Sequence, residues 1–315
     1  METDGYILSY INPDTDGVCT SLAIEELYRR KGKGNFKTVL AGRLTEETRY
    51  VLNKAEVNTN KIISEYDKRK PVILVDTHQL AQLPHLENVE NVIEIWDHHL
   101  DGEDEKIFKN ADIYNYKIGA IASKILEELY KEGGLDRKFS ILLGSAIISN
   151  TINFTAPSTT QYDKDMFSLA QKHFEYSKKY IDGLLQCRDS ILNTKLRNIL
   201  MYDMKCFEID NKKCMIGQLE LMEPKKLLNN KELNWEMQKL KTEKNADYLM
   251  FNIIDVKKNK SYLFCSDVES RKVIEKMFMR SFDGKKMEFD RILLRKTDLF
   301  PLLSKVLRND INEEN

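Results

Sequence analysis

The feature that most constrains the fold is a series of short apolar runs that alternate with helical patterns through the first half of the chain. The runs PVILV (71–75) and VIEIW (92–96) are short and mostly apolar, which is typical of buried strands. Apolar residues spaced for amphipathic helices occupy residues 17–31 and 119–131. Strands that alternate with helices favour an open, largely parallel sheet covered on both faces. We therefore predict an α/β N-terminal domain built on a doubly wound sheet.

The length of the chain, 315 residues, is about twice that of a common domain, so we expect two domains. Beyond the first half, strand patterns recur together with helical patterns, which indicates a second, smaller α+β domain. We predict that the first domain spans residues 1–188 and the second spans residues 195–308.

The charged residues are balanced, with 49 basic and 50 acidic side chains and a net charge of −1. Binding to nucleic acid depends on an excess of basic side chains that neutralise phosphates, so we do not expect a nucleic-acid partner. A small anionic substrate needs only a local basic cluster.

The five cysteines are scattered and form no CxxC pair, so we expect reduced thiols rather than a disulfide framework. The sequence shows no signal-peptide pattern and no apolar run of membrane-spanning length. We therefore expect a cytoplasmic protein with no membrane partner.

Acidic and imidazole side chains directly follow three of the predicted strands. Ligands bind at the carboxyl ends of parallel strands, and converging carboxylates repel one another unless cations lie between them. Asp and His are suitable ligands for Mn²⁺ or Mg²⁺, and two such ions about 4 Å apart hold a phosphoryl group and lower the pKa of a bridging water. The sequence therefore predicts a metal centre made from Asp14, Asp16, Asp76, Asp97, His98 and His99.

Each of these segments also has an ordinary structural interpretation when it is taken alone. The Asp14-Thr15-Asp16 turn after Asn-Pro fits a helix cap, because Asp is a common N-cap residue. Asp76 fits a strand-end cap equally well. The two histidines beside Asp97 are harder to explain in this way, because the whole chain has only five. Three acidic strand ends together favour the metal site.

Several of these motifs resemble those of a known family. The run IWDHHL (95–100) carries the Asp-His-His triplet of the DHH phosphoesterases, and NPDTD (12–16), VDTHQ (75–79) and the segment 144–163 resemble three further motifs of that family. The run RILLRKTDLFPLL (291–303) is similar to a signature of the type II, manganese-dependent inorganic pyrophosphatases. The segments 204–209 and 214–223 resemble the start of their second domain, of DHHA2 type. The resemblance, which extends to the related exopolyphosphatases, covers almost the whole chain.

The resemblance implies two Mn²⁺ or Mg²⁺ ions per subunit. It places Asp14 and Asp76 on one ion, and it places Asp16, Asp76 and His98 on the other, so that Asp76 bridges them. It implies that His99 contacts the substrate, that Asp97 orients the histidines, and that Asn150 lies at a metal-ligand position. The basic residues that it implies for binding phosphate oxygens are Lys205, Arg295 and Lys296. Taken without the resemblance, Lys205 is more simply interpreted as surface charge.

Two positions depart from the pattern of the pyrophosphatases. Tyr10 stands where they have a metal-binding His, and Asn150 stands where they have an Asp. The first change removes an imidazole, and the second replaces an anionic ligand with an amide that coordinates more weakly through its oxygen. His78 is either a substitute ligand or an exposed loop residue.

The resemblance implies hydrolysis of a phosphoanhydride, either inorganic pyrophosphate or a short polyphosphate, by a metal-activated water. A phosphodiesterase acting on a nucleotide or short oligonucleotide is the alternative enzyme, although the sequence lacks the GGGH-like motif of that branch. A non-catalytic binding protein of the same fold is a third hypothesis, because of Tyr10 and Asn150. We expect a small anionic phosphate as the binding partner and, by analogy with the family, a homodimer.

Overall fold

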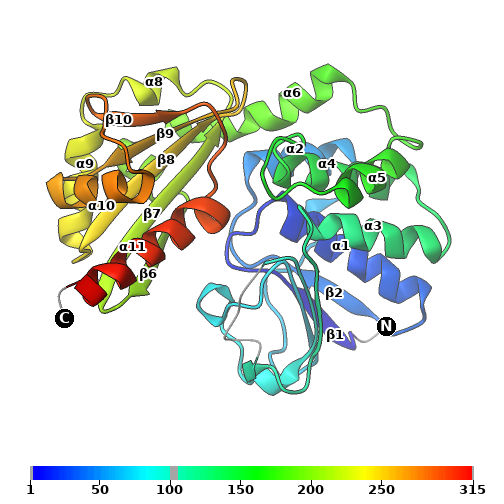
Figure 1. Ribbon diagram of the computed structural model, residues 1–315. Coiled ribbons are helices and arrows are strands. Elements are labelled where there is room, and N and C mark those ends of the chain that lie inside the picture. The colour runs from blue at the N-terminus through cyan, green and yellow to red at the C-terminus, as the bar shows by residue number, and fades with distance from the viewer. Residues whose placement is uncertain (1–2, 100–105, 314–315) are drawn as a thin grey trace. The chain divides into compact units, whose positions relative to one another are not determined.

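The structure is a computed structural model that describes residues 3–99 and 106–313 (Figure 1). The chain divides into two compact units, Met1–Leu184 and Leu185–Asn315. The boundary between them falls within helix α6 (Lys178–Gln186).

The first unit contains a five-stranded sheet in which all neighbouring strands are parallel, in the order β2-β1-β3-β4-β5. The strands are β1 (Gly5–Leu8), β2 (Phe36–Val39), β3 (Val72–Val75), β4 (Val92–Asp97) and β5 (Asp112–Asn115). The parallel α/β sheet that the sequence predicts is confirmed. The edge strand β5 was not predicted, because its residues are exposed or half-buried and carry no apolar run.

Helices cover one face of this sheet. The helix α1 packs against β1, β2 and β3 and against the helices α3 and α4 (Figure 1). The helices of this unit are α1 (Thr15–Arg30), α2 (Glu46–Lys54), α3 (Ile121–Lys131), α4 (Arg137–Asn150), α5 (Gln161–Ala170) and α6. On the other face, Tyr6, Leu8 and Leu74 pack with Leu83 and Phe108. Loops and short 3-10 turns, rather than long helices, therefore supply the cover on that face.

The second unit contains a mixed five-stranded sheet in the order β10-β9-β8-β7-β6, where only the β7–β8 pair is parallel. Its strands are β6 (Met204–Ile209), β7 (Lys212–Leu221), β8 (Tyr248–Asp255), β9 (Lys260–Cys265) and β10 (Lys286–Phe289). Its helices are α7 (Leu196–Met201), α8 (Lys225–Leu228), α9 (Leu233–Glu243), α10 (Val268–Phe278) and α11 (Phe300–Glu313). The predicted second domain of α+β class is confirmed.

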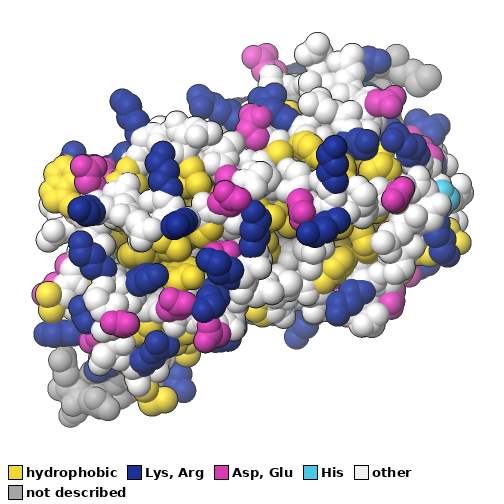
Figure 2. Space-filling model, turned by 90° about the horizontal axis from the view of Figure 1, so that it is seen from above, with side chains coloured by type: hydrophobic (Ala, Val, Ile, Leu, Met, Phe, Trp, Pro, Cys, Tyr) yellow, Lys and Arg dark blue, Asp and Glu magenta, His cyan; other side chains and the backbone are white. Residues whose placement is uncertain are grey.

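Two apolar clusters hold the second unit together. One joins α10 and α11 to the sheet through residues such as Ile274 and Leu303, and the other joins α9 to it through Met237 and Leu240. Within the described residues, no helix combines the length and apolar character needed to cross a membrane. On the face shown in Figure 2, basic and acidic side chains are interspersed, in keeping with the balanced charge of the sequence.

Candidate metal centre

The neighbouring parallel strands β3 and β4 bring their carboxyl ends to the same edge of the sheet. Val75 pairs with Trp96, so that Asp76 and Asp97 follow at matching positions. The backbone N–H of Asp76 donates a hydrogen bond of 2.8 Å to the carbonyl oxygen of Trp96. Asp76 has a φ of 62°, in the left-handed region that non-glycine residues seldom occupy. Such backbone strain concentrates at functional sites, where it directs a side chain that regular strand geometry would place elsewhere.

The side chain of Asp76 meets the paired histidines. Its Oδ1 lies 3.2 Å from Nε2 of His98 and 3.9 Å from Nδ1 of His99. One ligand atom from each of these three residues lies within 4.8 Å of the other two. Among the residues that the structure describes, these three form a group that could hold one metal ion.

The orientation of His98 fits a cation. Its Nδ1 lies 2.9 Å from the carbonyl oxygen of Ile118, which can only accept, so Nδ1 carries the hydrogen and donates. The lone pair is then on Nε2, which faces the Oδ1 of Asp76. Two acceptors at this distance repel unless a proton or cation lies between them. A histidine held through its other nitrogen is also the usual arrangement of an imidazole metal ligand.

Asp97 lies behind the histidine pair. Its Oδ1 accepts hydrogen bonds from the backbone N–H groups of His98 and His99 and lies 2.6 Å from Nδ1 of His99. Its Oδ2 pairs with Nδ1 of the fully buried His78. Burial opposes ionisation, but the neighbouring His99, His78 and His98 hold the pKa of Asp97 well below its usual range. The interpretation of His78 as an exposed loop residue is therefore wrong, and its bonded partner is Asp97.

Asp14 caps α1, as the ordinary interpretation of the turn predicts. Its Oδ1 accepts hydrogen bonds from the backbone N–H groups of Asp16 and Gly17, at 2.9 and 3.1 Å. A Cβ at Gly17 would lie only 2.4 Å from Oγ of Ser9, so the glycine permits α1 to start directly against the end of β1. This close approach places the Asp14 and Asp16 segment beside the strand ends.

The carboxylate of Asp16 is fully buried and accepts from four donors. Its Oδ1 accepts from Oγ1 of Thr20 and the backbone N–H of Ala122, both at 3.0 Å. Its Oδ2 accepts from the backbone N–H of Ile121 and from Nδ2 of Asn150, both at 2.9 Å. Burial and the nearby Asp76 carboxylate raise the pKa of Asp16 well above its usual range. The repulsion between the two carboxylates is a further feature that a bound cation would relieve.

The site predicted from the sequence did not include the start of α3, whose backbone N–H groups also contact it. Its N-cap residue, Ala120, has no side chain that can bond the exposed N–H groups of the first turn. Asp16 bonds two of these groups from α1, and Asp163 bonds Gly119, Ala120 and the hydroxyl of Ser123 from α5. A helix that starts without a capping residue is the sequence signal that points to such distant carboxylates.

The two departures from the family pattern, Tyr10 and Asn150, both lie in this centre. The phenol oxygen of Tyr10 accepts a hydrogen bond of 3.1 Å from the backbone N–H of Asp14. Burial and the carboxylates of Asp14 and Asp76 raise the pKa of Tyr10 well above its usual range, so its hydroxyl stays neutral. The amide Nδ2 of Asn150 lies 3.3 Å from Nε2 of His98 in addition to its bond to Asp16.

The predicted phosphate-binding residues lie in the second unit. Arg295 is buried, and Nη2 of its guanidinium donates to both carboxylate oxygens of Asp203, at 2.8 and 2.9 Å. It also donates to the backbone oxygen of Asp203. Lys205 in β6 is half-buried, and Lys296 is exposed. The structure thus engages Arg295 in an internal ion pair.

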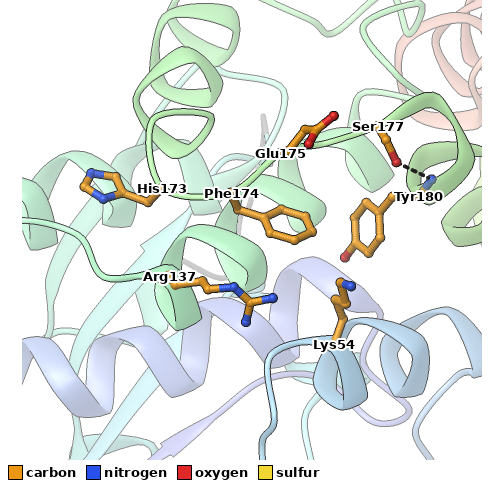
Figure 3. Close-up of a pocket in the computed structure, with 7 residues that line it drawn as sticks. All are labelled: Lys54, Arg137, His173, Phe174, Glu175, Ser177 and Tyr180. Carbon is orange, nitrogen blue, oxygen red and sulfur yellow. Dashed lines mark hydrogen bonds between the residues drawn. The ribbon is translucent and has the colours of Figure 1, made fainter.

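A separate hollow of about 360 Å³ lies on the first unit, away from the strand-end residues (Figure 3). The side chains of Lys54 and Arg137 converge there beside the ring of Phe174, each within 5.6 Å of its centroid. None of the predicted metal or phosphate ligands lines it.

The fold and the site together define an α/β protein with a cluster of Asp and His side chains, a candidate metal centre, at the carboxyl ends of its parallel strands. Two family models match the chain: the DHH family, N-terminal domain, over residues 5–147, and the DHHA2 domain over residues 182–306. The protein therefore belongs to the DHH family and carries a DHHA2 domain.

The relatives align along almost the entire chain. It is 26% identical to a manganese-dependent inorganic pyrophosphatase of Methanothrix thermoacetophila, covering 98% of this chain and 100% of that one. It is 28% identical to a probable manganese-dependent inorganic pyrophosphatase of Bacillus licheniformis, covering 96% and 98%. A solved structure from Methanococcus jannaschii, assigned to the family II inorganic pyrophosphatases, has a TM-score of 0.76 and 25% identity, covering 96% of this chain and 99% of that one.

Proposed function

We propose that the protein hydrolyses a phosphoanhydride, inorganic pyrophosphate or a short polyphosphate, with the help of Mn²⁺ or Mg²⁺. The observation that carries this proposal is the contact between Asp76 and His98, whose facing acceptor atoms fit a divalent ion. Full-length similarity to proteins named manganese-dependent inorganic pyrophosphatases supports the choice of substrate.

In the proposed site, Asp14 and Asp76 would hold one divalent ion, and Asp16, Asp76 and His98 would hold a second, with Asn150 at a further ligand position. When bound, a divalent ion polarises phosphoryl oxygens and lowers the pKa of the attacking water. His99 contacts the substrate, and its ring is oriented by the carboxylate of Asp97. The left-handed backbone of Asp76 and the Ile118 contact of His98 keep the metal-ligating atoms in place before the substrate arrives.

Lys205, Arg295 and Lys296 of the DHHA2 domain remain the proposed phosphate-binding residues. Positive side chains neutralise a pyrophosphate and stabilise the charge that develops in the transition state. Arg295 must first leave the carboxylate of Asp203 in order to do so. The homodimer and the cytoplasmic location stay predictions.

A phosphate-release assay tests the proposal. The purified protein, supplied with Mn²⁺ or Mg²⁺, is given pyrophosphate, tripolyphosphate, longer polyphosphates and short oligonucleotides. We expect phosphate release from pyrophosphate or from the short polyphosphates. Failure with every phosphoanhydride would overturn the proposal, and cleavage of oligonucleotides alone would support the phosphodiesterase alternative.

A further inference from the structure

Three polar side chains, those of Gln218, Asn252 and Ser261, interrupt a largely apolar face of the DHHA2 sheet. Gln218 in β7 pairs directly with Asn252 in β8, and Ser261 in β9 lies two pairs along from Asn252 in the β8–β9 ladder. Because side chains alternate between the two faces of a sheet, all three lie on the same face. All three are buried, and a buried polar group destabilises a fold unless it finds a hydrogen-bond partner. The apolar residues beside them on this face are Ile216, Met250 and Leu263.

All three side chains bond the backbone of the irregular segment that leads into Arg295. Oγ of Ser261 accepts a hydrogen bond of 2.8 Å from the backbone N–H of Leu293, and Nδ2 of Asn252 donates one of 2.8 Å to the carbonyl oxygen of the same residue. Oε1 of Gln218 accepts a hydrogen bond of 2.7 Å from the backbone N–H of Arg295. The segment belongs to no helix or strand until Arg295. Side chains of the sheet thus take the place of regular backbone hydrogen bonds in this segment.

Further contacts hold the same segment. Nη2 of Arg295 donates to both carboxylate oxygens of Asp203, and Oδ2 of Asp298 accepts a hydrogen bond of 3.0 Å from the backbone N–H of Leu294. Arg295 also starts a π-helical turn, a rare conformation that is frequent at functional sites. Lys296 is the next residue of that turn and is exposed. The backbone that carries Lys296 is therefore held directly ahead of it.

Support for buried backbone groups is a sufficient reason for such bonds in any fold. In this chain, however, the supported segment carries the basic pair that we propose to bind phosphate. A basic side chain stabilises a phosphate best when its position is fixed before the substrate arrives, because less conformational freedom is then lost on binding. The hydrogen bonds from the sheet would supply that fixed position.

We propose that Gln218, Asn252 and Ser261 are positioning residues for phosphate binding. They hold the backbone ahead of Arg295, so that Lys296 is placed to meet a phosphate group of the substrate. The three side chains act through the backbone and do not contact the substrate themselves. This inference rests on the proposed function, and it names the residues on which the phosphate-binding part of that function depends.

Ser261→Ala is the first test, because it removes the acceptor of the Leu293 N–H with little change of shape. The matched control is Ser270→Ala. Ser270, in α10, is equally buried, and its Oγ accepts a hydrogen bond of 3.1 Å from the backbone N–H of Leu249 in β8. Each substitution therefore takes a buried hydroxyl away from a leucine N–H of the same unit, but only Ser261 bonds the segment ahead of Lys296.

The KM for pyrophosphate, measured with Mn²⁺, distinguishes positioning from structural support. The KM of Ser261→Ala should rise about tenfold with little change in kcat, because a lysine that holds the phosphate before and during the reaction contributes mainly to binding. Ser270→Ala should keep the KM of the unaltered protein, while the Tm of both variants falls by a similar amount. A KM that rises equally in both variants, or in neither, would overturn the proposal.

A double substitution tests whether Ser261 acts through Lys296. The KM of Lys296→Ala should exceed that of the unaltered protein, and adding Ser261→Ala should then raise it little further, because the two changes remove the same interaction. A full additional tenfold rise would show that the hydroxyl acts through another group and would overturn the proposal. An unchanged KM in Lys296→Ala would overturn it as well.

Hydrogen exchange supplies a measurement that does not depend on activity. The backbone N–H groups of residues 293–298 should exchange faster in Ser261→Ala than in Ser270→Ala, and equal rates would contradict the positioning role. If the unaltered protein hydrolyses pyrophosphate and Ser261→Ala keeps its KM, only the positioning role is overturned. If the unaltered protein hydrolyses no phosphoanhydride, the proposed function itself is contradicted and the positioning role falls with it.

Discussion

Nε2 of His98 lies 3.2 Å from Oδ1 of Asp76, and this contact joins the ends of two neighbouring strands. The residues are 22 positions apart in the sequence, but the parallel pairing of β3 and β4 brings them together. Because Ile118 holds the other nitrogen of His98, the lone pair faces the carboxylate. The pair is the structural basis of the proposed metal centre, and the first two predictions test it.

His98→Ala should weaken Mn²⁺ binding by about 100-fold or more, because loss of a ligand should exceed the 10- to 100-fold that loss of a supporting residue costs. Isothermal titration calorimetry of the purified variant measures this change. His173→Ala is a matched control, since His173 is exposed and lies outside the centre. Equal affinities for His98→Ala and His173→Ala would contradict the role of His98.

Removal of metal should abolish the proposed hydrolysis. Dialysis against a chelator is expected to reduce phosphate release from pyrophosphate to the background rate, because the ion supplies the positive charge that polarises the phosphoryl oxygens and activates the water. Addition of Mn²⁺ should restore the activity. Full activity in protein that elemental analysis shows to be free of metal would refute a metal-dependent reaction.

Asp97→Asn should reduce Mn²⁺ affinity by about 10- to 100-fold, as is typical when the partner of a metal-ligating histidine is removed. The substituted amide cannot accept at all of the positions where Asp97 meets His78, His98 and His99. Calorimetric titration with Mn²⁺ measures the effect, and far-ultraviolet circular dichroism serves as the folding control. An unchanged affinity would show that the histidines keep their orientation without this carboxylate.

The ion pairs of Glu26 give a pH dependence of stability. Hydrogen bonding to Arg29, together with Arg30, lowers the pKa of Glu26 from 4.5 to about 2. A folded-state pKa below the unfolded value stabilises the fold above the unfolded pKa, and that contribution disappears as the pH falls to the folded value. Glu26→Gln should therefore cost about 0.5–1 kcal/mol at pH 7, after allowance for solvent screening, and almost nothing near pH 2.

Urea unfolding of the Glu26 variant at pH 7 and at the lowest pH where the protein stays folded measures this difference. Glu46→Gln is the control, because its contact with Arg49 is longer, at 3.6 Å, and both side chains are at least half exposed. The Glu46 variant should lose less stability at pH 7. A cost for Glu26→Gln that stays constant across the pH range would rule out the ion pair as its source.

Asp203→Ala should destabilise the DHHA2 domain by about 3 kcal/mol, because removing one partner leaves the buried Arg295 guanidinium without its counter-charge. Urea unfolding of the full-length protein provides the measurement. Glu223→Ala is the control, since Glu223 forms an exposed pair with Lys257 and should cost at most about 1 kcal/mol. Equal losses of unfolding free energy in the two variants would contradict a larger contribution of the buried Arg295–Asp203 pair to stability.

Much of the architecture could be predicted from the sequence because buried strands and amphipathic helices have characteristic spacing. The predicted strands at 71–75 and 92–96 correspond to β3 and β4, and the predicted helix at 119–131 corresponds to α3. The exposed edge strand β5 escaped prediction, because without a buried face it has no apolar pattern. The loops that cover the second face of the sheet were not predicted either, because irregular segments have no periodic pattern of apolar residues.

The candidate site could likewise be predicted from the sequence only in part. The sequence by itself determined which strand ends carry carboxylates and imidazoles, because each ligand directly follows an apolar run. It could not determine that His78 pairs with Asp97, that Ile118 fixes His98, or that the Asn150 amide faces Asp16. These contacts join residues that are 19 to 134 positions apart, and only the packing of helices on the sheet decides which of them meet.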